Sequence, residues 1–132
     1  MIFKSITTNL LVDNVTETIE YYKNKLGFSV LKTIPEQGDF DWALVKRNDV
    51  VIMFQSRRSL SNNLAQESGK KPGSGLTLYI YVQGIREIYL ALEDEVEIIS
   101  SIESTFYNTI EFSILDLNGY VITFAENNNE PS

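Results

Sequence analysis

Neither cysteine nor histidine occurs among the 132 residues of this chain. Without cysteine there is no disulfide, no thiol nucleophile and no zinc–thiolate site. Without histidine there is no imidazole general base, no Ser-His triad and no imidazole ligand for a metal. These two absences exclude most hydrolase and metalloenzyme mechanisms, and we expect no cofactor.

Long hydrophobic runs and an excess of basic residues are also missing. No apolar stretch is long enough to cross a bilayer, and the start MIFKSITTNLLV lacks the charged head of a secretory signal, so we expect a cytoplasmic protein. The net charge of −7 argues against nucleic acid as a partner. An acidic chain suits a cationic small molecule, although solubility alone also explains the charge.

The chain partly repeats itself at a fixed offset, and the length suits one domain. The segment 48–54, NDVVIMF, falls on 118–124, NGYVITF, an offset of 70 residues without a gap. Hydrophobic strands can resemble each other by chance, but identities elsewhere at the same offset favour a duplicated unit: Thr7 with Thr77, Val12 with Val82 and Glu17 with Glu87. We therefore expect two similar modules in one domain.

Each module reads as strand, helix and three strands. In the first, we expect strands at 5–12, 28–34, 40–47 and 50–56, and a helix over 14–26 that Asn14 caps with Glu17 and Gly27 terminates. In the second, we expect a helix over 85–96 and strands at 76–82, 96–102, 110–117 and 120–126. Asn118-Gly119 predicts the last hairpin turn, with Asp116 bonding its backbone.

The predicted class is therefore α+β, a single domain with modules at about 1–56 and 75–126 and a flexible linker over 57–74. One helix can cover only one face of each sheet. Because aromatic residues crowd the strands, the other face is expected to be covered too. Two curved mixed sheets that turn toward each other would enclose a groove for a ligand.

This duplicated β-α-β-β-β pattern, with its D-x-N-G turn, resembles the glyoxalase, bleomycin resistance and extradiol dioxygenase superfamily, whose members are also called vicinal oxygen chelate proteins. The resemblance covers about residues 5–126, through NLLVDNVTETIEYYKNKLGF, FDWALVKRNDVVIMFQS, YIYVQGIREIYLALEDEV and IEFSILDLNGYVITFAE. Within the superfamily the chain looks most like bleomycin resistance proteins, through FDWALVKRNDV and YVQGIREIYLALEDEV followed by EF and D-x-x-G.

This chain differs from the enzymes of the superfamily at their metal-binding positions. Its enzymes hold a divalent metal with His, Glu or Gln near the first and last strands of each module, and the matching positions here are Thr7, Met53, Thr77 and Thr123. Hydroxyls and a thioether make a poor site for zinc, nickel, iron or manganese. Gln55 and Glu126 lie nearby, at strand ends. The resemblance thus implies a protein that works without a metal.

Bleomycin resistance proteins, which this chain resembles, are homodimers that hold a cationic, planar-ringed drug in acidic, aromatic grooves between subunits. Candidate ligand-binding positions come from this likeness and from the sequence pattern. The aromatic positions of the family match Trp42, Tyr107 and Phe112. Strand alternation places Phe40 on the same face as Trp42, and Tyr79 on the same face as Tyr81. The 70-residue offset relates Asp41 to Glu111. Six of these positions have an alternative role. Trp42 and Phe112 suit a core, Tyr79 and Tyr81 suit a dimer contact, and the two carboxylates suit a solvated edge.

Three functions follow from these residues. The first is metal-independent binding of a planar aromatic or cationic small molecule in a homodimer groove, without transformation. The second is an enzyme of the same superfamily that uses unconventional metal ligands or an acid–base group such as Glu111 or Tyr107. The third is a structural or regulatory module whose groove serves dimerisation alone.

Overall fold

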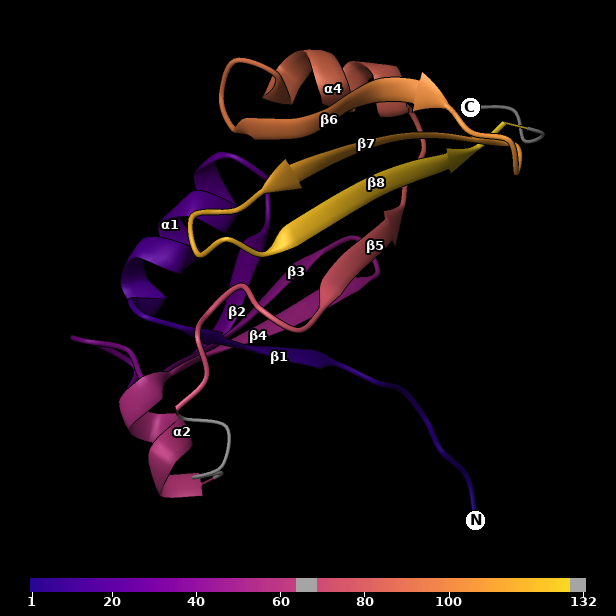
Figure 1. Cartoon of the computed structure of the whole chain (residues 1–132). Coiled ribbons are helices and arrows are strands. Elements are labelled where there is room, and N and C mark those ends of the chain that lie inside the picture. Colours follow the sequence, from indigo (N-terminus) through magenta and orange to yellow (C-terminus); the bar gives the residue numbers. More distant parts are fainter. Residues whose placement is uncertain (64–68, 129–132) are drawn as a thin grey trace. The chain divides into compact units, whose positions relative to one another are not determined.

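The chain folds into two compact units that divide between Pro72 and Gly73 (Figure 1). The computed structural model describes residues 1–63 and 69–128. Each unit contains one four-stranded mixed sheet and at least one helix, which confirms the predicted α+β fold of tandem β-α-β-β-β modules. None of the helices in the described ranges has the length and apolar character needed to cross a bilayer.

The first unit is built from β1 (Thr8–Val12), α1 (Val15–Asn24), β2 (Ser29–Ile34), β3 (Trp42–Arg47), β4 (Val50–Ser56) and α2 (Arg57–Asn63). Asn14 caps α1 as predicted, since its side chain accepts a hydrogen bond of 2.9 Å from the backbone N–H of Glu17. Gly27 then ends the turn after α1 with a φ of 73°, in the left-handed region that glycine adopts most easily.

The first sheet has the strand order β1-β4-β3-β2, with β1 parallel to β4 and the other pairs antiparallel. Its core side packs against α1, where the buried Tyr22 ring lies 4.7 Å from the Phe54 ring, centroid to centroid. Ala43 and Val45 of β3 point to this side and are buried. Trp42 and Leu44 therefore alternate to the opposite side, which we call the open face of the sheet.

Helix α2 occupies residues for which the sequence predicts a flexible linker. Leu60 is buried, and the Ser56 hydroxyl accepts a hydrogen bond of 3.2 Å from the backbone N–H of Ser59. The Gln55 amide donates to the Ser59 hydroxyl at 2.9 Å. An end-cap and one apolar anchor thus suffice for a short helix in a polar segment. The middle of the predicted linker, residues 64–68, lies outside the described ranges.

The second unit repeats the plan with β5 (Thr77–Tyr81), α4 (Ile85–Leu92), β6 (Glu97–Ser104), β7 (Thr109–Leu115) and β8 (Val121–Asn127). Its strand order is β5-β8-β7-β6, with β5 parallel to β8. Figure 1 shows α4 over one face of this sheet. Ile114 and Ile122 are fully buried, and they lie side by side in the register of β7 and β8.

The predicted turn between β7 and β8 is confirmed. The buried Asp116 carboxylate accepts hydrogen bonds of 2.9 Å from the backbone N–H groups of Asn118 and Tyr120. Gly119 follows with a φ of 89°. The side chain of Asp116 therefore satisfies the turn backbone, as its sequence context predicts.

The repeat is not free of gaps, because the two hairpins differ in length. In the first sheet Ala43 pairs with Phe54, and in the second Phe112 pairs with Phe124. The step from Phe54 to Phe124 is 70 residues, but the step from Ala43 to Phe112 is 69. The structural counterpart of Glu111 is therefore Trp42, one residue beyond the Asp41 that the ungapped overlay predicts.

Candidate functional site

The open face of the second sheet gathers the predicted tyrosines and Glu111. Phe112 points toward α4, where its ring lies 5.0 Å from the Tyr89 ring, so Glu111 alternates to the open face. Tyr79 and Tyr81 of β5 pair with Thr123 and Ala125 of β8, on that same face. The open face is thus the place where residues far apart in sequence meet.

Glu111 is the centre of this face, and its carboxylate accepts hydrogen bonds from three hydroxyl groups. Tyr79 donates a short bond to Oε2, and Thr109 donates to the same oxygen at 2.8 Å. Tyr107, in the turn between β6 and β7, donates to Oε1 at 3.1 Å. We call these four residues, Tyr79, Tyr107, Thr109 and Glu111, the Glu111 cluster.

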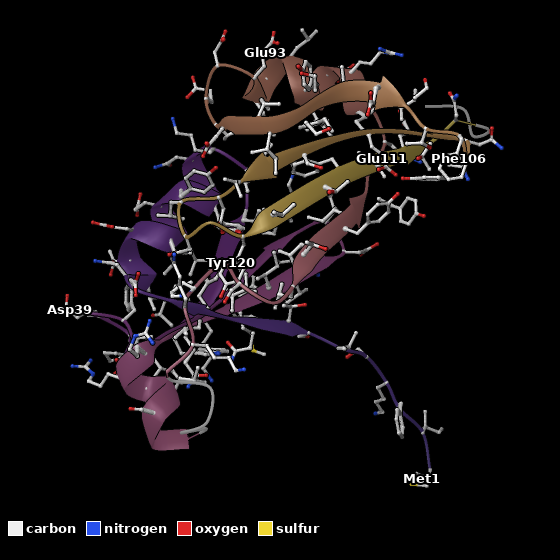
Figure 2. All side chains as sticks on the ribbon, in the orientation of Figure 1. Met1, Asp39, Glu93, Phe106, Glu111 and Tyr120 are labelled. Atoms are coloured by element: carbon white, nitrogen blue, oxygen red, sulfur yellow. The ribbon has the colours of Figure 1, made fainter. Side chains whose placement is uncertain are left out.

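Aromatic rings surround the Glu111 cluster and remain accessible. Tyr79, Tyr81 and Tyr107 are 46%, 67% and 51% exposed. The rings of Tyr79 and Tyr81 meet edge to face with centroids 5.2 Å apart, and those of Phe106 and Tyr107 do so at 4.9 Å. Figure 2 shows Phe106 and Glu111 at the same end of the sheet. Exposed ring surface beside a carboxylate is suited to a flat, positively charged ligand.

The carboxylate keeps both phenols of the cluster protonated. The hydrogen bond to Glu111, then desolvation and the nearby negative charge, raise the pKa of Tyr79 well above its ordinary value. Desolvation and then the bond to Glu111 raise the pKa of Tyr107. A phenol whose pKa is raised donates at neutral pH and does not act as a base.

This arrangement predicts an unusual alkaline titration. Tyr79 and Tyr107 should ionise above the ordinary range of a phenol, Tyr79 mainly because of its hydrogen bond to Glu111 and Tyr107 because of desolvation and the bond to the same carboxylate; both pKa values are raised. The stability that these bonds provide is complete below the unfolded pKa of about 10 and is lost as the pH rises through the higher folded values. The ring NMR signals of Tyr79 and Tyr107 should therefore shift only above the ordinary pH range of a phenol.

A pair of variants isolates the cause of the late ionisation. Glu111→Gln should move the ionisation of Tyr79 and Tyr107 down toward the ordinary range of a phenol. Glu103→Gln removes the same charge from the position opposite Glu111 on β6 and should leave both ionisations late. Ionisation of Tyr79 and Tyr107 in the ordinary range in the native protein, or equal effects of the two variants, would contradict this interpretation of the cluster.

Asp41 does not share the environment of Glu111. Its Oδ1 accepts from Arg58 Nη2 at 2.6 Å and Nε at 3.2 Å, and from the Ser56 hydroxyl at 3.1 Å. The hydrogen bond from Arg58 is the main cause that lowers the pKa of Asp41. The carboxylate thus joins β3 to the start of α2, and its charge is already balanced, so it leaves the candidate ligand-binding set.

Trp42 lies on the open face of the first sheet, as its counterpart Glu111 does on the second. It is half-buried and pairs with Ile34 of β2 and Gln55 of β4. Leu44 and Met53, also half-buried, pair with each other next to it. Phe40 is half-buried but precedes β3. Strand alternation therefore does not place it on the same face as Trp42, as the sequence predicts.

Phe112 belongs to the core instead of the site. Its side chain is 1% exposed and contacts the rings of Tyr89 and Phe124, each with centroids 5.0 Å away. The core alternative considered for this residue is thus the observed one, because β7 turns it toward α4. It also leaves the candidate ligand-binding set.

Thr109 is the site residue that sequence reasoning missed. It lies two residues before Glu111, so strand alternation places its hydroxyl on the same face. This spacing of two residues is visible in the sequence. Beyond the cluster, the hydroxyls of Ser113 and Thr123 bond each other at 2.7 Å. The open face of the second sheet is therefore richer in hydroxyls than the aromatic pattern alone indicates.

The residues at the superfamily's metal positions do not fit a metal. Thr123 Oγ1 is already bonded to Ser113, and Thr7, Met53 and Thr77 supply only hydroxyls and a thioether. Glu126 turns toward α4, where it accepts from the backbone N–H groups of Gly84 and Ile85. Within residues 1–63 and 69–128, no group of three or more acidic side chains could hold a metal ion.

Structures similar to this chain come from several bacteria. The structure of TioX from Micromonospora sp. ML1 has a TM-score of 0.78 and 13% identity, and the match covers 95% of this chain and 99% of that one. A superfamily member from Sphaerobacter thermophilus has a TM-score of 0.76 and 18% identity, with 95% and 98% covered. A family enzyme from Burkholderia phytofirmans has a TM-score of 0.75 and 14% identity, with 92% and 96% covered. These identities are low enough that the matches support the fold alone.

Sequence comparison gives the family directly. No curated protein sequence matches the chain significantly. The family model of the Glyoxalase/Bleomycin resistance protein/Dioxygenase superfamily, however, matches residues 4–124. With two β-α-β-β-β modules and nearly the whole chain matched, this protein belongs to the glyoxalase, bleomycin resistance and dioxygenase superfamily.

Proposed function

We propose that this protein binds a planar, cationic small molecule as a homodimer, without a metal and without transforming the ligand. The observation that carries the proposal is the Glu111 cluster, in which two accessible phenols and Thr109 converge on one carboxylate. In the described part of the chain, no lysine or arginine forms an ion pair with Glu111. Its negative charge thus remains available to a ligand.

The open face of the first sheet offers a stacking surface of its own. Trp42, Leu44 and Met53 are neighbours in the register of β3 and β4, and all three are half-buried. A flat ring that stacks on an indole with a cation nearby gains about 1–2 kcal/mol. We therefore propose Trp42 as the ring-stacking residue of the first unit, and the Glu111 cluster as the acceptor of cationic groups in the second unit.

The Glu111 cluster also bears on the enzymatic alternative. The raised pKa values of Tyr79 and Tyr107 keep both phenols protonated at neutral pH, so neither can serve as a general base. An acid–base enzyme requires groups that exchange protons near neutral pH. The cluster holds its protons in place, which favours binding over proton transfer.

A fluorescence titration tests the proposal. Bleomycin and smaller planar cations should change the emission of Trp42, the only tryptophan, in a saturable manner. Trp42→Leu, measured by equilibrium dialysis, should weaken binding about 10-fold, because the stacking surface is lost. Leu90→Ala, on an exposed position of α4, should leave the affinity unchanged.

Three results would contradict the proposal in different ways. Absence of saturable binding to every compound would favour the dimerisation module. Stoichiometric nickel, zinc, manganese or iron that survives dialysis would favour the enzyme. A mass by light scattering equal to the 15.0 kDa of one chain would remove the homodimer.

A further inference from the structure

The direction of each hydrogen bond in the Glu111 cluster can be assigned, because a carboxylate only accepts and each hydroxyl has one proton. Tyr79 and Thr109 therefore donate their protons to Oε2, and Tyr107 donates its proton to Oε1. After these bonds form, the phenol oxygens of Tyr79 and Tyr107 have only lone pairs left. Both oxygens can then accept a further hydrogen bond but cannot donate one.

A fourth hydroxyl, that of Thr105, adjoins these hydrogen bonds. Thr105 Oγ1 lies 2.7 Å from Thr109 Oγ1 and accepts a bond of 3.1 Å from the Thr109 backbone N–H. Since Thr109 donates its proton to Glu111, Thr105 is the donor within the hydroxyl pair, and its proton also lies within reach of the Thr109 backbone oxygen at 3.3 Å. Three hydroxyl protons thus point to the carboxylate and the fourth points to Thr109, so the accessible side of the cluster presents the lone pairs of the two phenols.

The negative charges around the cluster favour the same kind of ligand group. Glu103 of β6 is the cross-strand partner of Glu111, so both carboxylates lie on the open face. Glu103 is exposed, and Glu111 is half-buried among its hydroxyl donors. Hydrogen-bond polarity and charge thus both favour a ligand group rich in N–H donors, and both oppose a carboxylate or a phosphate.

We propose that the Glu111 cluster is an acceptor subsite selective for a planar fork of N–H donors, of the amidinium or guanidinium class. This inference rests on the proposed function, since it specifies which part of a ligand this face reads. A delocalised planar cation can donate to Glu111 and to the phenol oxygens while its flat side stacks on the exposed tyrosine rings. Tyr79 and Tyr107 are then specificity-determining residues, because Glu111 fixes the direction of their protons.

Two probes of nearly equal shape test the polarity directly. Benzamidinium and benzoate share a phenyl ring and a planar three-atom end group, but benzamidinium only donates whereas benzoate only accepts. Binding to the full-length protein is measured from the shifts of β7 backbone amides in NMR spectra. Benzamidinium should bind at least about 10-fold more tightly than benzoate, a ratio typical of a lost charge-assisted bond.

Glu111→Gln should remove that preference. The glutamine amide can donate to the phenol oxygens, and their protons are then free to turn outward. The affinity ratio of benzamidinium to benzoate should fall below about 2-fold or reverse, because a neutral donor replaces the charge-assisted acceptor. Glu103→Gln removes an equal charge from the same face but no hydrogen bond of the cluster, so it should keep most of the ratio.

The comparison of the two probes on the native protein needs no variant, so the inference stays testable even if Glu111→Gln does not fold. Equal binding of both probes, or no saturable binding of benzamidinium, would overturn it. A loss of preference in Glu103→Gln as large as that in Glu111→Gln would also overturn it, since charge alone would then explain the selectivity. Trp42 fluorescence reports the first unit, so a planar ligand that still binds there would leave the proposed function standing.

Discussion

Replacement of Phe112 by alanine is expected to lower the free energy of unfolding by about 3–5 kcal/mol, the usual cost of deleting a buried ring. The side chain is 1% exposed and fills the space between the rings of Tyr89 and Phe124. The loss should be measured by denaturant titration. Circular dichroism is the suitable signal, because the only tryptophan lies in the first unit.

Tyr81→Ala provides the matched control on the opposite side of the sheet. Tyr81 is 67% exposed, and its one ring contact is with Tyr79, so the free energy of unfolding should change by no more than about 1 kcal/mol. Ligand affinity should show the reverse order, so Tyr81→Ala should lower it more than Phe112→Ala does. If Phe112→Ala folded with native stability and lost only ligand binding, its placement in the core would be wrong.

Local signals in the sequence predicted most of the fold. Asn14 and Glu17 define the start of α1, and Asn118-Gly119 defines the last turn, because capping and turn chemistry involve residues close in sequence. The alternation of tyrosines in β5 likewise placed Tyr79 and Tyr81 on one face. Such patterns need no knowledge of the distant chain.

The register of β7 could not be predicted in the same way. Strand side chains alternate with a period of two, so a slip of one residue exchanges the two faces. The overlay at 70 residues ran through a hairpin in which Leu115 pairs with Val121, whereas Arg47 pairs with Val50 in the first sheet. That difference made Asp41 look equivalent to Glu111.

Contacts between distant residues account for the other differences. Leu60 anchors α2 in a segment whose polar composition predicted only a linker. The charge of Asp41 is balanced by Arg58, which lies 17 residues further along the chain, and no local pattern predicts that contact. Composition and periodicity describe a segment by itself, so they cannot reveal a partner that only the folded chain brings near.

Glu126 is the position where such a distant contact should have a large effect. The helix α4 begins after Gly84, which has no side chain to cap it, and Glu126 of β8 accepts from the backbone N–H groups of Gly84 at 2.9 Å and Ile85 at 3.4 Å. Glu126→Ala leaves both donors without this partner in a buried place. The free energy of unfolding should fall by about 1–3 kcal/mol, measured by denaturant titration with circular dichroism.

Two further variants separate capping from charge. Glu126→Gln keeps one acceptor oxygen and should lose less stability than Glu126→Ala, although it also loses the favourable interaction of a carboxylate with the helix N-terminus. Glu87→Gln removes a charge from the exposed first turn of α4 and should cost no more than about 1 kcal/mol. Native stability of Glu126→Ala together with impaired ligand or metal binding would show that this carboxylate serves a site. The bonds to Gly84 and Ile85 indicate instead that the second unit uses its last strand to hold its helix, so Glu126 does not join Glu111 and Glu103 on the open face.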